Sequence, residues 1–431
     1  MIEDSLFDMI EQTFSKDRLD QLKFDLERPA IYGVRLNPYK VIQIDDIEGE
    51  LSLLNENVFI PKEYKPMVHH PYHHAGAYYI QDPSSSLPVE YLDLKPNDVV
   101  LDMCAAPGGK SSQILSSIPN GFLIANEIDS KRNKKLQTNL GRWGVENYVV
   151  TQEDGRSLSL KLNNCFDKIL LDAPCSGEGL IRRKKDYTFS YDEKRVQAFA
   201  NLQQELLESA YQLAKNQATI VYSTCTLNAI ENEDVLKQFL TLHPECKLEP
   251  IEHPFKEPGL NGFHQAARFF PSQHGEGQFM AKIKIYKNES SQELHFKPGK
   301  EEKRLIEAIE FEACFEERNQ KLYGLKTRGF LDEPLAITQD GTEIASIKKN
   351  RFDFHHNVSQ SLYFQTNFPI HNCTHSQAYH YLNGQTVASE LKGYCVMSYK
   401  GLVLGLGKGN GKHINNRYPK QLRNRFLNYS L

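Results

Sequence analysis

Residues 99–110 read Val-Val-Leu-Asp-Met-Cys-Ala-Ala-Pro-Gly-Gly-Lys, an apolar run that ends in an acid and a glycine-rich loop. Such a run followed by glycines predicts a buried parallel strand, a turn and the start of a helix. The glycines allow close backbone approach to a ligand, and the amides of the following helix face it. The stretch therefore predicts the first strand of an α/β sheet that binds a nucleotide-like cofactor. A phosphate loop of the NTPase type is disfavoured, because it needs glycine where Cys104 stands, and the G-x-G-x-x-G fingerprint is absent.

Strand and helix patterns alternate along the chain after this first strand. Strands are predicted near 99–103, 122–126, 147–151, 167–171 and 218–223, and helices near 110–118, 130–142, 192–215 and 228–242. A hairpin from 267–270 to 278–285 is predicted to close the sheet. This alternation predicts an α/β fold with a doubly wound, Rossmann-like sheet. Seven strands with an antiparallel end are typical of class I methyltransferases.

Composition shifts divide the chain into four parts. Residues 1–92 are expected to form an N-terminal α+β extension with a helical pattern over 4–28, and 93–288 to form the α/β domain that contains this sheet. Residues 289–304 are polar and indicate a linker, and 305–431 form a β-rich accessory region. These boundaries predict a catalytic sheet flanked on both sides by accessory structure.

The composition is that of a soluble globular protein. The 431 residues are 40% hydrophobic and 25% charged, and no apolar run approaches the roughly 18–20 residues of a membrane span. The acidic N-terminus lacks the layout of a signal peptide, and the eight cysteines include no C-x-x-C pair, so a reducing cytoplasm is expected. From Lys392 onward the chain has eight Lys or Arg and no acid, which indicates a polyanion partner.

An acid follows each of three successive predicted strands. Glu127 is positioned to accept the ribose hydroxyls of a cofactor, Asp154 is positioned for an adenine amino group, and Asp172 ends the next strand. A single such acid is more often a helix cap. Acids at the same position after three successive strands favour S-adenosylmethionine over NAD as the cofactor.

Two cysteines stand just past the ends of apolar runs. Cys175 follows Ile169-Leu-Leu-Asp-Ala-Pro, and Cys225 follows Ala218-Thr-Ile-Val-Tyr-Ser-Thr. The carboxyl edge of an open α/β sheet is where ligands bind, so both thiols are predicted beside the cofactor. This arrangement suggests a cysteine-dependent transferase, and composition and spacing do not decide which thiol attacks.

The segments 102–110, 172–179 and 222–226 together resemble the motif set of the Nol/Nop/Sun family of RNA cytosine-C5 methyltransferases. The resemblance implies a covalent mechanism in which Cys225 adds to C6 of cytosine and Cys175 assists product release. It also implies that Asp172 binds the base edge and that Lys110 lies between cofactor and base. DNA cytosine-C5 methyltransferases use the cysteine of Pro-Cys instead, but here Pro174-Cys175 is followed by Ser-Gly.

The same resemblance implies a set of binding residues. Those for S-adenosylmethionine are Cys104, Ala105, Ala106, Pro107, Gly108, Gly109, Lys110, Glu127, Arg132, Asp154 and Asp172. The C-terminal 370–431 resembles the PUA-like module of the 16S rRNA methyltransferase F subgroup. RNA contacts are predicted for the N-terminal extension 1–92 and for the basic residues Arg182, Arg183, Lys408, Lys412 and Arg417.

These features predict an RNA cytosine-C5 methyltransferase that acts on 16S ribosomal RNA or the small ribosomal subunit. A tRNA methyltransferase of the same chemistry and a non-catalytic RNA-binding assembly factor are the alternatives. The histidine-rich stretch 69–74 has no well-placed acid or cysteine nearby, so no metal is predicted. We expect a cytoplasmic monomer without a membrane partner.

Overall fold

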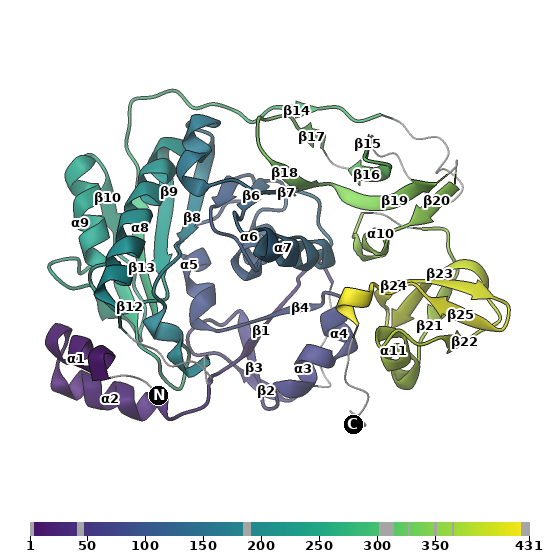
Figure 1. Ribbon diagram of the computed structural model, residues 1–431, viewed down its shortest axis with the longest axis horizontal. Helices are drawn as coiled ribbons and strands as arrows, with labels where there is room; N and C mark the ends of the chain where they lie inside the picture. The colour runs from purple at the N-terminus through teal and green to yellow at the C-terminus, as the bar shows by residue number, and fades with distance from the viewer. Residues whose placement is uncertain are drawn as a thin grey trace.

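Figure 1 presents a computed structural model of the protein, which describes residues 4–40, 47–183, 191–300, 314–325, 328–348, 351–363 and 366–423. A central sheet with helices on both faces has the N-terminal elements along its lower side, and a β-rich C-terminal region lies to its right (Figure 1). Lys184 and Lys185, which continue the basic run after Arg183, lie outside the described residues. So do residues 301–304 at the end of the predicted linker.

The central sheet has the predicted strands in a doubly wound order. Five parallel strands stand in the order β7-β6-β5-β8-β9, and β13 and β12 extend them in antiparallel fashion. The predicted seven-stranded methyltransferase sheet and its closing hairpin are therefore confirmed. The bounds are β5 Val99–Asp102, β6 Phe122–Asn126, β7 Tyr148–Thr151, β8 Phe166–Asp172, β9 Ala214–Thr224, β10 Lys247–Glu249, β11 Glu257–Pro258, β12 Ala267–Phe269 and β13 Gln278–Lys284.

Helices cover both faces of this sheet because each has one apolar stripe. In α7, Leu136, Leu140 and Trp143 recur at helical spacing and are buried against one face. Helices α8 and α9 bury their apolar residues against the other face. The helices are α5 Leu87–Glu90, α6 Gly109–Ser117, α7 Ser130–Trp143, α8 Glu193–Leu213 and α9 Glu233–Leu242, and short 3-10 helices span Ser84–Ser86, Gly155–Leu160 and Glu178–Arg183.

The N-terminal extension combines two helices with a small antiparallel sheet of order β2-β3-β1-β4. The helical pattern over 4–28 forms two helices rather than one, because the Ser15 hydroxyl accepts the Arg18 amide at 3.1 Å and caps a new helix. The elements are α1 Asp4–Thr13, α2 Lys16–Leu26, β1 Gly33–Leu36, β2 Gly49–Leu51, β3 Val58–Pro61, α3 Lys65–His69, α4 Pro71–His74 and β4 Tyr78–Gln81.

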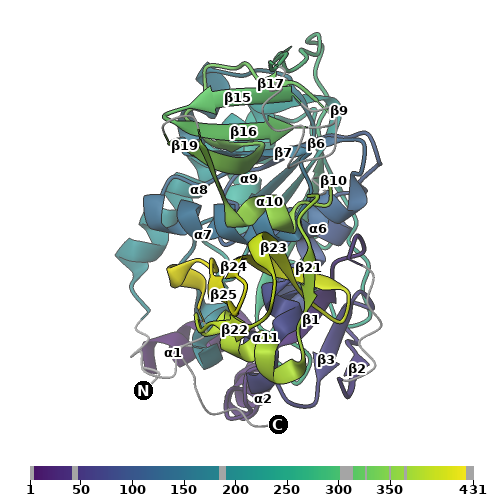
Figure 2. The same cartoon turned by 90° about the vertical axis from the view of Figure 1, so that its right-hand side faces the viewer.

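The C-terminal region is β-rich, as predicted, and contains a four-stranded and a five-stranded sheet. Figure 2 shows α10 between these two sheets, and α10 contacts α7, β19 and β24. The elements are β14 Phe296–Lys297, β15 Cys314–Arg318, β16 Lys321–Leu325, β17 Phe330–Leu331, β18 Ile337–Asp340, β19 Thr342–Lys348, β20 Arg351–Phe354, α10 His356–Gln360, β21 Ile370–Asn372, α11 His375–Leu382, β22 Val387–Ala388, β23 Lys392–Tyr399, β24 Leu402–Asn410 and β25 His413–Asn416, followed by a 3-10 helix, Lys420–Leu422.

Two segments of the chain after the catalytic sheet pack directly on it. Strand β18 pairs with β7 and so becomes an edge strand of the central sheet. Phe296, inside the predicted linker, packs edge-on against Phe122 with ring centroids 5.1 Å apart. The predicted domain boundaries stay predictions, but the accessory region and the catalytic sheet share structure.

The histidine-rich stretch connects the N-terminal extension to the C-terminal region. His74 Nδ1 and the Tyr418 hydroxyl share a hydrogen bond of 2.7 Å, and His70 caps α4 by accepting the Tyr72 amide. Within the described ranges, no group of three or more His, Cys, Asp or Glu side chains is arranged to hold a metal ion. No helix in the same ranges is long and apolar enough to cross a membrane.

Candidate active site

A cavity of about 230 Å³ opens at the carboxyl edge of the central sheet. The loop after β5 and the tip of β8 form one side, and β4 of the N-terminal extension forms another. The lining comprises Tyr79, Ile80, Gln81, Asp82, Ser85, Asp102, Cys104, Ala105, Ala106, Pro107, Gly109, Lys110, Asp172, Leu180 and Arg183. The sequence motifs at 102–110 and 172–179 therefore meet at one site, as the parallel-sheet prediction requires.

The glycine loop approaches its neighbours closely. Gly108 precedes α6 with φ of 105°, a conformation that side chains rarely adopt. A Cβ on Gly109 would stand 2.9 Å from the Tyr79 ring. The loop is thus built for close backbone approach at the mouth of the cavity.

Lys110 and Asp172 form an ion pair inside this cavity, with Nζ 2.6 Å from Oδ2. The Ser223 hydroxyl donates to Asp172 Oδ1 at 2.7 Å, which fixes the carboxylate from the adjacent strand β9. Burial lowers the pKa of Lys110, but Asp172 raises it, and the pKa lies above its ordinary value. Lys110 is therefore a cation held beside the carboxyl end of β8.

The two cysteine thiols lie next to each other. The Sγ atoms of Cys175 and Cys225 are 3.0 Å apart, and the Cys225 amide donates to Cys175 Sγ at 3.3 Å. The hydrogen bond with Cys225 and then burial raise the pKa of Cys175 well above its usual range. Cys175 is consequently held in its neutral thiol form, where it can donate a hydrogen bond or a proton.

Sequence reasoning missed a buried polar network behind the thiols. Glu178 and Glu231 are fully buried, and the Asn228 amide donates to an oxygen of each at 2.9 Å. The Ser176 hydroxyl lies within hydrogen-bonding distance of both carboxyl groups and can donate its one proton to either, and the Leu227 amide donates to Glu178 Oε2 at 2.8 Å. Glu178 stood in a recognised motif, whereas no pattern marked Glu231. The network ties the loop after β8 to the loop after β9.

The predicted cofactor acids differ in their surroundings. Glu127 is 2% exposed at the tip of β6, and Arg132 Nη1 lies 3.2 Å from its Oε2. Glu127, like Asp154, is absent from the cavity lining, and its buried Oε2 has the Arg132 guanidinium beside it but accepts no aligned hydrogen bond from the described part of the chain, which leaves it the capacity to accept one. Arg132 also donates to the Ala106 carbonyl at 2.7 Å and thereby joins Glu127 to the glycine loop. These residues fit the ribose end of S-adenosylmethionine.

Asp154 lies outside the cavity lining and is paired with Arg156. Arg156 Nη2 stands 2.6 Å from Asp154 Oδ2, and hydrogen bonds from Arg156 hold the pKa of Asp154 below its usual range. An adenine amino group would have to share this carboxylate with Arg156. Its role at the cofactor stays a prediction.

The structure corrects the prediction that Arg182 contacts RNA. Its side chain is 1% exposed, its Nε stands 3.1 Å from Glu276 Oε2, and it donates to the Gly275 carbonyl at 2.7 Å. A guanidinium buried in this way supports the fold and does not reach a phosphate. Arg183 lines the cavity, donates to Asp82 Oδ2 at 3.0 Å and lies over the Tyr32 ring.

The remaining predicted RNA contacts lie on the β24–β25 hairpin and just beyond it. Lys408 is exposed, with its Nζ 5.2 Å from the centre of the Tyr394 ring, and Lys412 is exposed at the turn. Arg417 forms an ion pair with Asp353 and approaches the same Tyr394 ring. The structure thus leaves the two lysines more accessible than the arginine.

Two family profiles match this chain. The profile described as "16S rRNA methyltransferase RsmB/F" matches residues 89–284, and "Methyltransferase RsmF PUA domain" matches residues 368–424. Proteins named ribosomal RNA small subunit methyltransferase F are similar over most of their length. That of Aliivibrio fischeri strain MJ11 is 35% identical and that of Erwinia tasmaniensis 31%, over 81% of this chain and 80% and 79% of those proteins, respectively.

Solved structures share the fold. A methyltransferase homologue from Pyrococcus horikoshii is 30% identical with a TM-score of 0.56, covering 64% of this chain and 93% of that one. NSun6 from the same organism, solved with SFG, has a TM-score of 0.58 at 22% identity, covering 67% of this chain and 99% of that one. The second likeness supports the fold alone.

Proposed function

The chain belongs to the RsmB/F family of 16S rRNA methyltransferases, and from this premise we propose that it forms 5-methylcytosine in 16S ribosomal RNA. The single observation that carries the proposal is the pair of Sγ atoms 3.0 Å apart beside the Lys110–Asp172 ion pair. A methyl transfer to an oxygen or an amine has no use for two adjacent thiols. S-adenosylmethionine supplies the methyl group when bound.

C5 of cytosine is a poor nucleophile, and a covalent bond from the protein makes it a better one. We assign that bond to Cys225, whose thiolate sulfur adds to C6 and sends electron density to C5. After C5 has gained the methyl group, it loses its proton to a base, and the electrons of that C–H bond restore the ring double bond. The C6–sulfur bond breaks in the same step and returns the thiolate.

Cys175 and the ion pair have supporting roles in this proposal. Cys175, held as a thiol 3.0 Å from Cys225, is placed to assist release of the product. The Asp172 carboxylate is placed to accept a hydrogen bond from the cytosine N4 amino group, which uracil lacks. Lys110 keeps the carboxylate in position and places a positive charge beside the reacting ring.

The cofactor and RNA assignments complete the proposal. The ribose is assigned to Glu127, with Arg132 holding that carboxylate, and the methionine end is assigned to the loop Cys104–Lys110. Lys408 and Lys412, both exposed, are assigned to RNA phosphates. The target base must be unpaired or flipped out, because a duplex would bury C5 and C6.

A denaturing gel tests the reaction and the two thiol roles together. Wild type, Cys175→Ala and Cys225→Ala are incubated with labelled 16S rRNA and S-adenosylmethionine. Cys314→Ala is the control, because it removes a cysteine in β15, outside the candidate active site. We expect a covalent protein–RNA band to accumulate in Cys175→Ala and to be missing in Cys225→Ala. Cys314→Ala should behave like wild type. A band trapped by Cys225→Ala would reverse the roles, and near-normal product from that variant would overturn the covalent mechanism.

Bisulfite sequencing decides the substrate. In a strain that lacks the gene, a cytosine of 16S rRNA that resists conversion in the parent strain should become convertible. Loss of protection in tRNA instead would indicate a tRNA methyltransferase. Unchanged cytosines in both RNA classes would contradict the proposed activity.

A further inference from the structure

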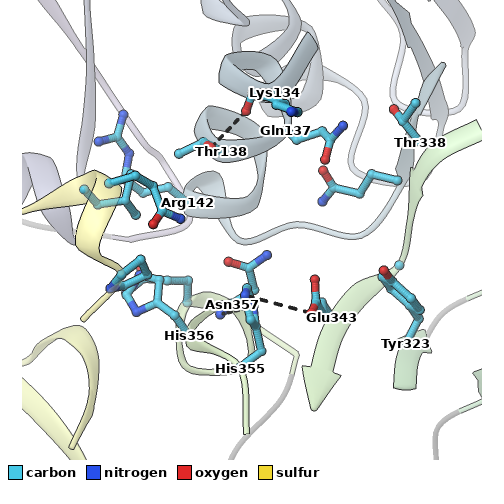
Figure 3. A pocket seen from close by; sticks show the side chains of 16 residues that line it. Lys134, Gln137, Thr138, Arg142, Tyr323, Thr338, Glu343, His355, His356 and Asn357 are labelled. Atoms are coloured by element: carbon cyan, nitrogen blue, oxygen red, sulfur yellow. Dashed lines mark hydrogen bonds and ion pairs between the residues drawn. The ribbon is translucent and has the colours of Figure 1, made fainter. Parts of the chain in front are cut away.

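A second cavity, of about 300 Å³, lies between α7 of the catalytic sheet and the C-terminal region. Figure 3 shows α7 on one side of this space, with α10 and the strand carrying Glu343 on the other. The cavity exists only where these two parts of the chain meet, because β18, β19 and α10 provide its far wall. The activity proposed above assigns nothing to it.

The walls of this cavity carry neutral groups that can both donate and accept hydrogen bonds. Gln137 of α7 and Asn357 of α10 point into the space from opposite sides (Figure 3). The side-chain amide nitrogen of Gln339, on β18, donates a hydrogen bond to the Tyr148 hydroxyl oxygen at 2.8 Å. The buried Oε1 of Gln339 accepts no hydrogen bond from the described residues. Carboxamides of this kind are the side chains that read the edges of nucleobases.

The lining also includes the carboxylate of Glu343 and three flat rings, those of Tyr323, His355 and His356. Glu343 is 13% exposed, is neutralised by Lys321 at 3.0 Å, and keeps its carboxylate beside His355 (Figure 3). A carboxylate accepts hydrogen bonds from the amino groups of bases. The rings of Tyr323 and His355 lie along the same wall, where a flat ligand can stack.

We propose that this cavity binds one unpaired nucleobase that carries an exocyclic amino group, from the RNA that the enzyme modifies. The inference rests on the proposed function in that the RNA is its substrate. A volume of about 300 Å³ is at the lower end for small-ligand sites and suits one nucleotide rather than a helix. Lys134, exposed on α7, is placed to meet the adjoining phosphate.

One residue, Asn133, joins the cavity to the end of β6 where Glu127 stands. Gln137 Nε2 and the Thr338 hydroxyl both donate to Asn133 Oδ1, at 2.8 and 3.0 Å. The Asn133 amide in turn donates to the Glu127 carbonyl at 3.0 Å. A base held here would therefore anchor the RNA beside the catalytic sheet while the target base occupies the thiol site.

Substitutions at Asn357 test the inference without touching the catalytic groups. Asn357→Trp fills the cavity, and Asn357→Leu keeps its volume but removes the polar edge. Gln197→Trp, at an exposed position of α8, is the matched control for adding an indole. The dissociation constant for 16S rRNA is measured for each, together with thermal unfolding to verify that each variant folds.

We expect Asn357→Trp to weaken RNA binding at least fivefold, Asn357→Leu to weaken it less, and Gln197→Trp to bind like wild type. Ultraviolet cross-linking of wild type to 16S rRNA should attach a nucleotide to the peptides that carry Tyr323 or His355, and Asn357→Trp should lose that attachment. Equal dissociation constants for Asn357→Trp and Gln197→Trp, with no cross-link at either peptide, would overturn the inference.

The same samples separate this inference from the proposed function. If wild type forms the covalent adduct and the filled cavity changes neither binding nor cross-linking, only the cavity assignment fails. If no variant forms an adduct or methylates RNA, the proposed function fails, and the binding comparison still decides whether the cavity holds a base.

Discussion

Asp102 at the end of β5 is a buried carboxyl group that faces the catalytic cavity, and the Ser111 hydroxyl donates to it at 2.6 Å. Burial raises its pKa to about 7, despite that hydrogen bond. At a pH between the ordinary pKa of an aspartate and about 7, the Asp102 carboxyl group is ionised in the unfolded chain but still protonated in the folded protein. Folding stability from this group is therefore complete at low pH and declines as pH rises towards 7.

Asp102→Asn should remove this contribution, because the amide stays neutral at every pH. Urea unfolding of wild type and variant is compared at pH 5 and pH 7.5. We expect the stability of the variant relative to wild type to increase from the lower to the higher pH. A constant difference between the two proteins would show that Asp102 is ionised throughout.

A substitution at Asp172 tests the proposed hydrogen bond between its carboxylate and the cytosine N4 amino group. Asp172→Asn keeps the shape of the side chain but removes the charge that pairs with Lys110 and that, in the proposed mechanism, accepts a hydrogen bond from the base amino group. We expect kcat for methyl transfer to fall about a hundredfold, the scale of one lost electrostatic contact in a transition state. Asp167→Asn, near the opposite end of the same strand and paired with Lys215, is the control and should keep its kcat. Equal losses in both variants would argue against a role in chemistry.

Residue chemistry could be predicted from the sequence where a motif places it just after a strand. Asp172, Cys175 and Cys225 follow predicted strands, so the topology alone brought them together. Arg182 was predicted wrongly because a basic run looks the same whether its members are exposed or buried. Its partner Glu276 is distant in the sequence, and no local pattern connects the two.

The loops after β8 and β9 act as one unit because their buried side chains bond to each other. Asn228 donates to Glu178 and Glu231, and burial raises the pKa of Glu178 above its usual range. Asn228→Leu would leave both carboxyl groups short of a donor, at a cost of roughly 3 kcal/mol in unfolding free energy. Asn201→Leu, on the exposed face of α8, should change it by less than about 0.5 kcal/mol. Urea unfolding measures both, and similar values would contradict the network's role.

Gly108 shows what the glycine loop requires of its backbone. Gly108→Ala should cost about 1–3 kcal/mol, because alanine tolerates a φ of 105° poorly. Gly262→Ala is the control: its φ is 89°, and an added Cβ would meet nothing within 4 Å. Both should lose stability in urea, but only Gly108→Ala should weaken binding of S-adenosylhomocysteine in calorimetry. Unchanged binding of S-adenosylhomocysteine by Gly108→Ala would show that the glycine loop does not contact the cofactor.

Element positions were predictable from local periodicity, and element ends were less so. The strands of the central sheet stand within a few residues of their predicted positions. Helix α9 was predicted from 228 but begins at Glu233, because Asn228 and Glu231 serve the buried network before the helix starts. Such tertiary demands do not appear in a pattern of apolar residues.

At the scale of the whole molecule, the sequence indicated separate catalytic and accessory parts but not how they join. Strand β18 is short and only partly apolar, so nothing in it predicted pairing with β7. The polar stretch before it resembled a free linker, yet Phe296 packs on Phe122. Interfaces between distant segments depend on complementary surfaces, which a single sequence does not display.

Arg328 forms polar contacts across this junction. It donates to the carbonyl of Tyr148 at 2.9 Å, lies over the Phe122 ring, and pairs with the fully buried Asp340 at 2.5 Å. Arg328→Met would keep much of the packing but leave the Asp340 charge unpaired. We expect a loss of about 3–5 kcal/mol in the free energy of unfolding.

The double variant Arg328→Met/Asp340→Asn distinguishes this ion pair from simple packing. With the buried charge removed as well, the double variant should be more stable than Arg328→Met alone, although Asp340 also accepts the Leu331 amide at 2.7 Å. Urea unfolding of wild type, both single variants and the double variant gives the coupling between the two residues. Strictly additive losses would show that Arg328 holds the accessory region by its contacts with β7 and Phe122, and that the pairing with Asp340 adds nothing to the junction.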